Sequence, residues 1–221
     1  DLIVQERVSV TVLTETHMSA AEHKVAVGYL RRVHGLEAFG TAGWYSGRKG
    51  ARASGGVLVI WDPSVLLREG TEVVMAHRIV RVSLRVKADG APLHLVGAYM
   101  PVRQATQNDE VDEAWAYLDV EAMRPDFICG GDLNAEMDED GTDSDRLLNE
   151  MCSQRSITSH QPRGPTYKSG DTETRIDHWL VSSGLVGATR TAGRTEPISD
   201  HWGVRAEYTP RCRGAHDMGE S

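Results

Sequence analysis

An acid and an amide two residues apart follow directly on an apolar run, and these residue types at this spacing could do chemistry. The run is Phe127-Ile128-Cys129, two glycines follow it, and Asp132 and Asn134 come next. Side chains alternate along a strand with a period of two, so Asp132 and Asn134 can face the same side. Because Asp, Asn and Gly also favour turns in any protein, an ordinary turn at a strand end is the alternative interpretation.

Further polar residues stand at the ends of other apolar runs: Glu15, Tyr99, Asp177, Asp200 and His201. A carboxylate at the end of a buried strand must be exposed, paired with a basic group or bound to a cation. Asp177 and Arg175 share a face of their predicted strand and could simply pair with each other. If all these strand ends lie along one rim, however, their side chains converge with Asp132 and Asn134 on one site.

Length and composition favour one large domain. The 221 residues are 40% hydrophobic, and we find no linker, repeat or low-complexity tract before the polar end. We therefore predict one domain over residues 1–209 and a polar, flexible tail over residues 210–221. The three cysteines are odd in number and form no CxxC pair, which supports neither a disulfide framework nor a thiolate metal site.

Net charge argues against nucleic-acid binding by bulk electrostatics, because the chain carries a formal charge of −8. A local basic surface remains open, with residues 48–52 as one candidate segment. Clustered carboxylates that hold a divalent cation would account for part of the acidity. The apolar runs are far too short to span a bilayer, and the N-terminus lacks the order of a signal peptide, so we expect no membrane partner and an intracellular protein.

Hydrophobic periodicity predicts strands interleaved with helices. A Ser-x-x-Glu capping box at Ser19 predicts a helix over 19–34, and apolar spacing predicts helices over 107–123 and 143–155. An Asp-Gly turn predicts a hairpin between 79–86 and 93–100, and residues 161–170 read as a loop. Other strands are predicted over 8–13, 36–45, 56–61, 127–129, 175–181 and 203–208. This order favours an α+β layered sandwich with two packed sheets and helices outside.

Six motifs together resemble the exonuclease–endonuclease–phosphatase superfamily, which includes the DNase-I-like nucleases. They occur in the order Thr14-Glu15-Thr16-His17, Gly55-Gly56-Val57, Tyr99-Met100-Pro101, Gly130-Gly131-Asp132-Leu133-Asn134, Arg175-Ile176-Asp177-His178 and Ser199-Asp200-His201. Within this superfamily, three features look most similar to the endonuclease domains of non-LTR (LINE-type) retrotransposons: Glu15-Thr16-His17, the Pro165-Thr166-Tyr167 loop and Arg175-Ile176-Asp177. The resemblance implies a four-layered α/β/β/α sandwich of two packed mixed sheets with flanking helices.

The resemblance also implies a role for each residue of the predicted site. Glu15 would hold Mg²⁺, with Mn²⁺ as a possible substitute, and Asp200 would lie beside the metal. Asp132, oriented with help from Asn134, would position or deprotonate the attacking water, and Tyr99 would donate to a phosphate oxygen. His201 would contact the scissile phosphate while Asp177 fixes its imidazole. The expected substrate contacts are Thr166, Tyr167, Lys168 and Arg175.

The chain also departs from the family pattern. The family's first strand normally lies upstream of the position of Glu15 and is expected to be absent here, so a further segment or another chain would supply it. Val102 stands where apurinic-site enzymes usually have Asn, which disfavours abasic-site specificity.

Three interpretations of function stay open. The leading one is a Mg²⁺-dependent endonuclease that nicks DNA for a retrotransposon, as part of a longer polyprotein in the nucleus. The alternatives are a phosphomonoesterase of the same superfamily and an incomplete, non-catalytic domain. The phosphomonoesterase is disfavoured because its inositol-phosphatase branch typically has Trp-Cys-Asp-Arg where this chain reads Thr174-Arg175-Ile176-Asp177.

Overall fold

The strand Val57–Trp61 (β3) is buried on both faces, and its side chains show how the layers form. The computed structural model describes residues 9–45, 53–103, 108–137, 141–186, 189–197 and 200–208. Val57, Val59 and Trp61 of β3 face a core shared with a second sheet. Leu58 and Ile60 face the opposite way, into a core under a helix. A strand covered on both faces reads as a continuous apolar run, as this one does.

The smaller sheet joins three antiparallel strands in the order β1 (Val10–Leu13), β3 and β2 (Glu37–Thr41). Its outer face is covered by the helix α2 (Ala20–Tyr29), which continues as the π-helical turn η1 (Leu30–His34). The predicted capping box begins α2, with the Ser19 side chain accepting from the Glu22 N–H. The helix predicted over 19–34 is therefore confirmed.

The larger sheet has six strands in the order β4 (Leu66–Met75), β5 (Ile79–Val86), β6 (Pro92–Tyr99), β7 (Phe127–Asp132), β11 (Asp177–Ser182) and β8 (Ile157–His160). Only the pair β6–β7 is parallel. A parallel pair needs a crossover, and the helix α3 (Asp109–Glu121) lies within it. Because β6 and β7 run the same way, both end at the same edge.

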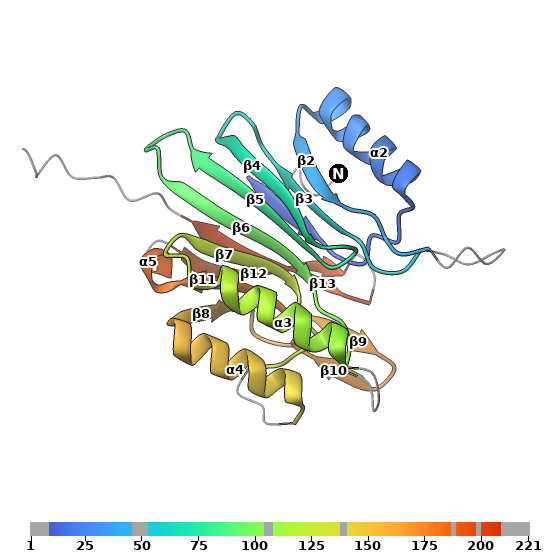
Figure 1. Ribbon diagram of the computed structural model, residues 1–221, viewed down its shortest axis with the longest axis vertical. Helices are drawn as coiled ribbons and strands as arrows, with labels where there is room; N and C mark the ends of the chain where they lie inside the picture. The colour runs from blue at the N-terminus through green and yellow to red at the C-terminus, as the bar shows by residue number, and fades with distance from the viewer. Residues whose placement is uncertain are drawn as a thin grey trace, which may run out of the picture.

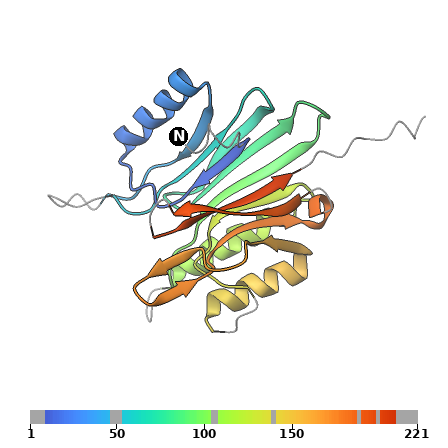
Figure 2. The ribbon, with the colours of Figure 1, turned by 180° about the vertical axis from the view of Figure 1, so that it is seen from behind.

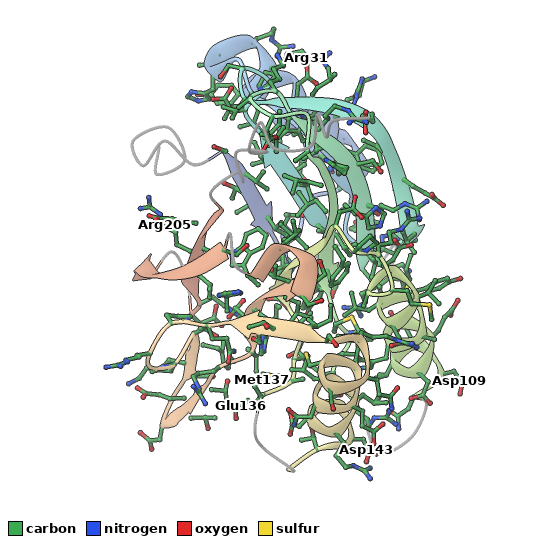
Figure 3. All side chains as sticks on the ribbon, turned by 90° about the vertical axis from the view of Figure 1, so that its left-hand side faces the viewer. Arg31, Asp109, Glu136, Met137, Asp143 and Arg205 are labelled. Carbon is green, nitrogen blue, oxygen red and sulfur yellow. The ribbon has the colours of Figure 1, made fainter. Side chains whose placement is uncertain are left out.

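The outer face of the larger sheet is covered by α3 and by the helix α4 (Asp143–Arg155), as Figure 1 shows. The predicted apolar stripe of α3, which includes Val111, Trp115 and Leu118, enters this core together with Leu148 and Met151 of α4. In Figure 3, Arg31 on η1 and Asp143 at the start of α4 mark opposite sides of the molecule. Two sheets between two helical layers confirm the predicted four-layered sandwich.

The remaining elements complete the described chain. They are a small hairpin of β9 (Tyr167–Ser169) and β10 (Thr172–Thr174), the short helix α5 (Ser183–Val186), and an antiparallel pair of β12 (Thr189–Pro197) and β13 (Trp202–Tyr208). The tail over 210–221 and the basic segment 48–52 lie outside the described residues, so their predictions stay predictions. Within the described part of the chain, no helix combines the length and apolar character needed to cross a membrane.

A cavity of about 280 Å³ separates β1 from β13. Ser9 and Val10 line one side of the cavity and Arg205–Glu207 the other, while apolar side chains of the large sheet form its floor. Figure 2 shows β1 and the β12–β13 pair on the same side of the large sheet. In the described chain β1 pairs with β3 and β13 pairs with β12, so each strand has one hydrogen-bonded neighbour.

Candidate active site

The ends of three neighbouring strands bring Tyr99, Asp132 and Asp177 together. Tyr99 lies beside Asp132 in the parallel pair β6–β7, and Asp177 lies opposite Asp132 in the antiparallel pair β7–β11. The backbone needs glycine here, because Gly131 has a φ of 149° and a Cβ at this position would come within 1.9 Å of the Ala98 carbonyl oxygen. The predicted convergence of these strand ends is therefore found.

Asp132 is the most buried acid of this rim, at 2% exposure, and Asn134 orients it through the backbone. The Asn134 N–H donates to Asp132 Oδ1 at 2.9 Å, with Asn134 itself in the left-handed region at φ 47°. The Asn134 side-chain amide donates instead to the Met100 carbonyl at 2.8 Å. One residue therefore orients the carboxylate and ties the end of β6 to that of β7.

A second pair is formed by Asp177 and His201. His201 Nδ1 donates to Asp177 Oδ2 at 2.9 Å, as expected from the sequence. Burial lowers the pKa of His201, but the hydrogen bond and charge of Asp177, with the charges of Asp132 and Asp200, outweigh it and raise the pKa to about 9. The imidazole is consequently held in one orientation and favours its protonated form.

The rim carries excess negative charge. Burial and then the charge of Asp177 raise the pKa of Asp132 to about 7, with a further contribution from Glu15, against the Asn134 N–H and His201. Asp132, Asp177 and His201 each offer one ligand atom within 4.8 Å of the others. The carboxylate oxygens of Asp132 and Asp177 suit a hard divalent cation, which would also relieve the crowding of negative charge. These residues therefore fit a metal ion.

Glu15 lies on the other side of this cluster and bonds to Tyr99. The Tyr99 hydroxyl donates to Glu15 Oε1, and burial followed by this bond and charge raises the pKa of Tyr99. Glu15 itself has a φ of 48°, which turns the chain at the end of β1. His17 Nε2 lies 3.8 Å from Glu15 Oε2, and Arg78 Cζ lies 4.8 Å from the centre of the Tyr99 ring.

Sequence reasoning assigned no role to His17 or Arg78. His17 belongs to the Thr14-Glu15-Thr16-His17 motif, so its position beside the glutamate was a usable signal. Arg78 had no such signal, because only the pairing of β5 with β6 brings it to Tyr99.

The predicted substrate contacts fall into two groups. Tyr167 and Lys168 lie beside the histidine: the Tyr167 ring is 4.7 Å from the His201 ring, and the Lys168 N–H donates to the Asp200 carbonyl at 2.9 Å. The Lys168 ammonium is exposed and pairs with Glu173 at 2.8 Å. For Arg175 the structure gives a backbone bond, from its N–H to Glu136 Oε1 at 2.7 Å.

Thr166 requires a correction, because it is fully buried at 0% exposure. Its hydroxyl accepts the N–H groups of Ile176 and Asp177 at 3.1 and 3.0 Å. A buried side chain used in this way does not reach a substrate. Thr166 instead fixes the start of β11, and with it the position of Asp177.

Asp200 is exposed, and it is not one of the three residues of the metal-fitting cluster. Its effect on the rim is electrostatic, through the pKa of His201. Ser199, the first residue of the Ser-Asp-His motif, lies outside the described residues. The two predicted metal ligands, Glu15 and Asp200, are therefore not members of the cluster formed by Asp132, Asp177 and His201.

His178 supports the site from behind, a role that sequence reasoning missed. It is 1% exposed, its Nε2 donates to the Ala135 carbonyl at 2.8 Å, and its Nδ1 accepts from the Ser159 hydroxyl at 2.9 Å. Burial lowers the pKa of His178 to about 4, so the ring is neutral at pH 7. The adjacent Gln161 side chain donates to the Arg175 carbonyl at 2.8 Å. These bonds hold β11 and the segment after β7 in register.

A four-layered sandwich with carboxylates, a histidine and a tyrosine along one rim defines a hydrolase of the DNase-I-like class. The model of the Endonuclease/Exonuclease/phosphatase family matches residues 1–201. The chain therefore belongs to this family, whose members hydrolyse phosphate esters and generally depend on a divalent metal. The resemblance inferred from the six motifs is confirmed.

Solved structures agree with this assignment. The endonuclease domain of TRAS1, a telomere-specific non-LTR retrotransposon, is 16% identical with a TM-score of 0.67, over 94% of this chain and 88% of that chain. The AP endonuclease LMAP from Leishmania major is 15% identical with a TM-score of 0.71, over 95% and 81%. A mannosyl-6-phosphatase from Bacteroides thetaiotaomicron is 14% identical with a TM-score of 0.62, over 93% and 85%. At these identities the likeness concerns the fold, and no curated protein sequence matches the chain.

Proposed function

We propose that this protein is a Mg²⁺-dependent endonuclease that hydrolyses phosphodiester bonds in DNA. The observation that carries the proposal is the cluster of Asp132, Asp177 and His201, with ligand atoms within 4.8 Å of one another and the Tyr99–Glu15 pair at the same rim. Hydrolysis of a phosphodiester needs an oriented water, neutralisation of the phosphate charge and stabilisation of the leaving alkoxide oxygen. The rim offers a candidate group for each need.

His201 and Asp132 are the proposed reacting groups of the chain. His201 Nδ1 is committed to Asp177, so the opposite ring nitrogen, Nε2, is the one directed away from this pair. That nitrogen contacts the scissile phosphate or passes a proton to the leaving oxygen. Asp132, held by the Asn134 N–H, orients and deprotonates the water.

Glu15 and Asp200 remain the proposed metal ligands. A divalent cation held there would offset the charge of the carboxylates and so favour the approach of an anionic phosphate. Tyr99 donates to Glu15 in the free protein and is proposed to turn its hydroxyl to a phosphate oxygen in the complex. Tyr167, Lys168 and Arg175 are the proposed contacts to the DNA strand.

Nicking for target-primed reverse transcription is the proposed biological role. It is supported by the fold shared with the TRAS1 endonuclease domain, and it implies a longer polyprotein that acts in the nucleus. We also infer that a further segment or another chain adds a strand between β1 and β13. The cavity there supports this inference, because it lies between β1 and β13, and each of these two strands has one paired neighbour among the described residues.

A nicking assay on supercoiled plasmid tests the activity. The intact chain with Mg²⁺ or Mn²⁺ is expected to convert supercoiled to open-circular DNA, whereas Asp132→Asn is expected to leave it supercoiled. The same proteins are assayed on p-nitrophenyl phosphate, a monoester, and bis(p-nitrophenyl) phosphate, a diester. Hydrolysis of the monoester alone would replace the proposal by a phosphomonoesterase. No hydrolysis of any substrate would make the chain a non-catalytic domain.

A further inference from the structure

Two neighbouring aromatic residues are exposed in the connection between β2 and β3. Trp44 is 57% exposed and Tyr45 is 52% exposed. Exposed aromatic side chains mark binding surfaces more often than other residues do, because their faces gain much when they are covered. Trp44 stands out because backbone hydrogen bonds hold it and the glycine before it.

Backbone hydrogen bonds hold Trp44 in place. Its N–H donates to the Ser54 carbonyl at 2.7 Å, and the Ser54 N–H donates back to the Trp44 carbonyl at 2.8 Å. The preceding Gly43 N–H donates to the Met18 carbonyl at 2.9 Å, and a Cβ on Gly43 would come within 2.9 Å of the Ser54 oxygen. Trp44 is therefore presented from a closely packed backbone.

The segment opposite Trp44, residues 53–55, contacts the candidate active site. On one side of Ser54, the Ala53 carbonyl accepts from His17 Nδ1 at 3.0 Å. On the other side, a Cβ on Gly55 would lie 3.6 Å from the Tyr99 ring. Trp44 is thus one backbone bridge away from groups that contact Glu15 and Tyr99. Figures 1 and 2 both show the C-terminal end of β2 and the β9–β10 hairpin on the same side of the molecule.

We propose that Trp44 stacks on an unpaired nucleobase of the strand whose phosphodiester lies in the active site. This inference rests on the proposed function, and it names a preferred form of substrate. A base inside a duplex is already stacked on both faces, so an exposed indole gains contact only with a base that is unpaired or at an opened step. Stacking accepts any base, so Trp44 adds affinity with little sequence preference. Tyr45 widens the same surface.

Another exposed apolar surface serves as the matched control. Val25, Tyr29 and Val33 on α2 and η1 are also exposed, with Tyr29 at 52% like Tyr45. They lie on the outer helix of the smaller sheet, and among the described residues no hydrogen bond joins their side chains to the active-site rim. Removing the Tyr29 ring therefore tests whether any exposed aromatic residue would give the same effect.

Binding is measured by fluorescence anisotropy with fluorescein-labelled oligodeoxythymidine of 12 nucleotides, a probe whose length is on the order of one single-strand site. The 221-residue chain with Asp132→Asn is the parent, so that the probe stays intact. Trp44→Ala is expected to weaken binding about 10-fold or more, Trp44→Phe by less than about 3-fold, and Tyr29→Ala not at all. Circular dichroism and thermal unfolding check that each variant is folded.

A second probe isolates the base. An oligonucleotide with the same phosphates but with tetrahydrofuran abasic residues in place of the bases is expected to bind the parent and Trp44→Ala equally. Equal binding of oligodeoxythymidine by the parent and Trp44→Ala would overturn the inference, and so would an equal loss on the abasic probe. Failure of the proposed function is read separately, as a lack of plasmid nicking by the unmutated chain.

Discussion

Asp132 is buried and lies close to the carboxylates of Asp177 and Glu15. We therefore expect its replacement to lower activity without lowering stability. Asp132→Asn keeps the shape and removes the charge that burial and Asp177 disfavour. We expect phosphodiester hydrolysis to fall by roughly 10²- to 10⁴-fold, the usual contribution of a general base. We expect the melting temperature to stay equal or rise, because a crowded buried charge is lost.

Hydrolysis rates and thermal unfolding of the same preparation test this expectation. A variant that loses activity while its melting temperature is kept cannot owe the loss to misfolding. A hydrolysis rate equal to that of the unmutated chain would remove Asp132 from the mechanism.

Tyr99 is the next residue whose contribution can be isolated. Tyr99→Phe keeps the ring beside Arg78 and removes the hydroxyl that donates to Glu15. A hydrogen bond to a charged group contributes on the order of 1.5–3 kcal/mol, so we expect hydrolysis to fall about 10- to 100-fold. Tyr117→Phe on α3, where the ring is 39% exposed, is the matched control. Initial rates for the two variants decide the question, and equal rates would exclude a role for the Tyr99 hydroxyl.

The lowered pKa of His178 predicts how the stability of the folded chain depends on pH. Its pKa is about 4 in the folded chain against an ordinary value of 6.5, so protonation favours the unfolded chain. The contribution of neutral His178 is fully present above pH 6.5 and is lost as the pH falls from 6.5 toward 4. A difference of about 2.5 pH units corresponds to a loss on the order of 3 kcal/mol.

Urea unfolding at pH 7 and pH 4.5 measures this loss. His178→Gln, which cannot be protonated, is expected to lose less stability over that interval than the unmutated chain. Burial also lowers the pKa of His94 and of His160, so some dependence on pH persists in the variant. An equal loss in both proteins would contradict the assignment to His178.

At the scale of elements, the pattern of apolar residues was sufficient to predict a helix or strand when one or both of its faces are buried. The helices over 109–121 and 143–155 and the strand β3 follow this rule and were predicted. β4 was missed because it is the edge of its sheet and its residues are mostly exposed. β9 and β10 are three residues each, too short for any period: β9 was read as part of the loop over 161–170, and β10 was not predicted.

The candidate site was predictable to the extent that it depends on strand ends. Asp132, Asp177 and Tyr99 end up together because their strands are neighbours. Thr166 was misread because a threonine in a loop looks the same whether its hydroxyl faces solvent or caps two backbone amides. The bond from Tyr99 to Glu15 joins residues 84 positions apart, and it arises from sheet packing that no local pattern contains.

The cap formed by Thr166 gives a prediction for the start of β11. Thr166→Val has nearly the same shape but leaves the Ile176 and Asp177 N–H groups without their acceptor. We expect a loss of about 2–3 kcal/mol in the free energy of unfolding, the cost of buried unsatisfied donors. Thr166→Ser keeps the acceptor and is expected to lose less. Denaturant titration compares the two, and a valine variant as stable as the serine variant would refute the capping role.

The whole molecule balances an acidic surface against a substrate that is itself anionic. If DNA is the substrate, as proposed, the net charge of −8 means that long-range attraction is weak and that binding depends on local groups at the rim. The four layers make this possible by ending several buried strands at one edge. The layers fix the position of the candidate reacting groups, and the proposed substrate contacts lie on connections between strands, at Trp44 and on the β9–β10 hairpin.

The cavity between β1 and β13 has a consequence for how the protein behaves in concentrated solution. Each strand has one paired neighbour in the described chain, so its other edge is a template on which a second molecule can assemble. We expect reversible self-association that grows with protein concentration. Val10→Lys, which places a charge at this edge, is expected to suppress it. Sedimentation velocity over a range of concentrations measures the self-association of the unmutated chain and of Val10→Lys. If the unmutated chain stays monomeric at every concentration, the free edges of β1 and β13 do not pair with a second molecule.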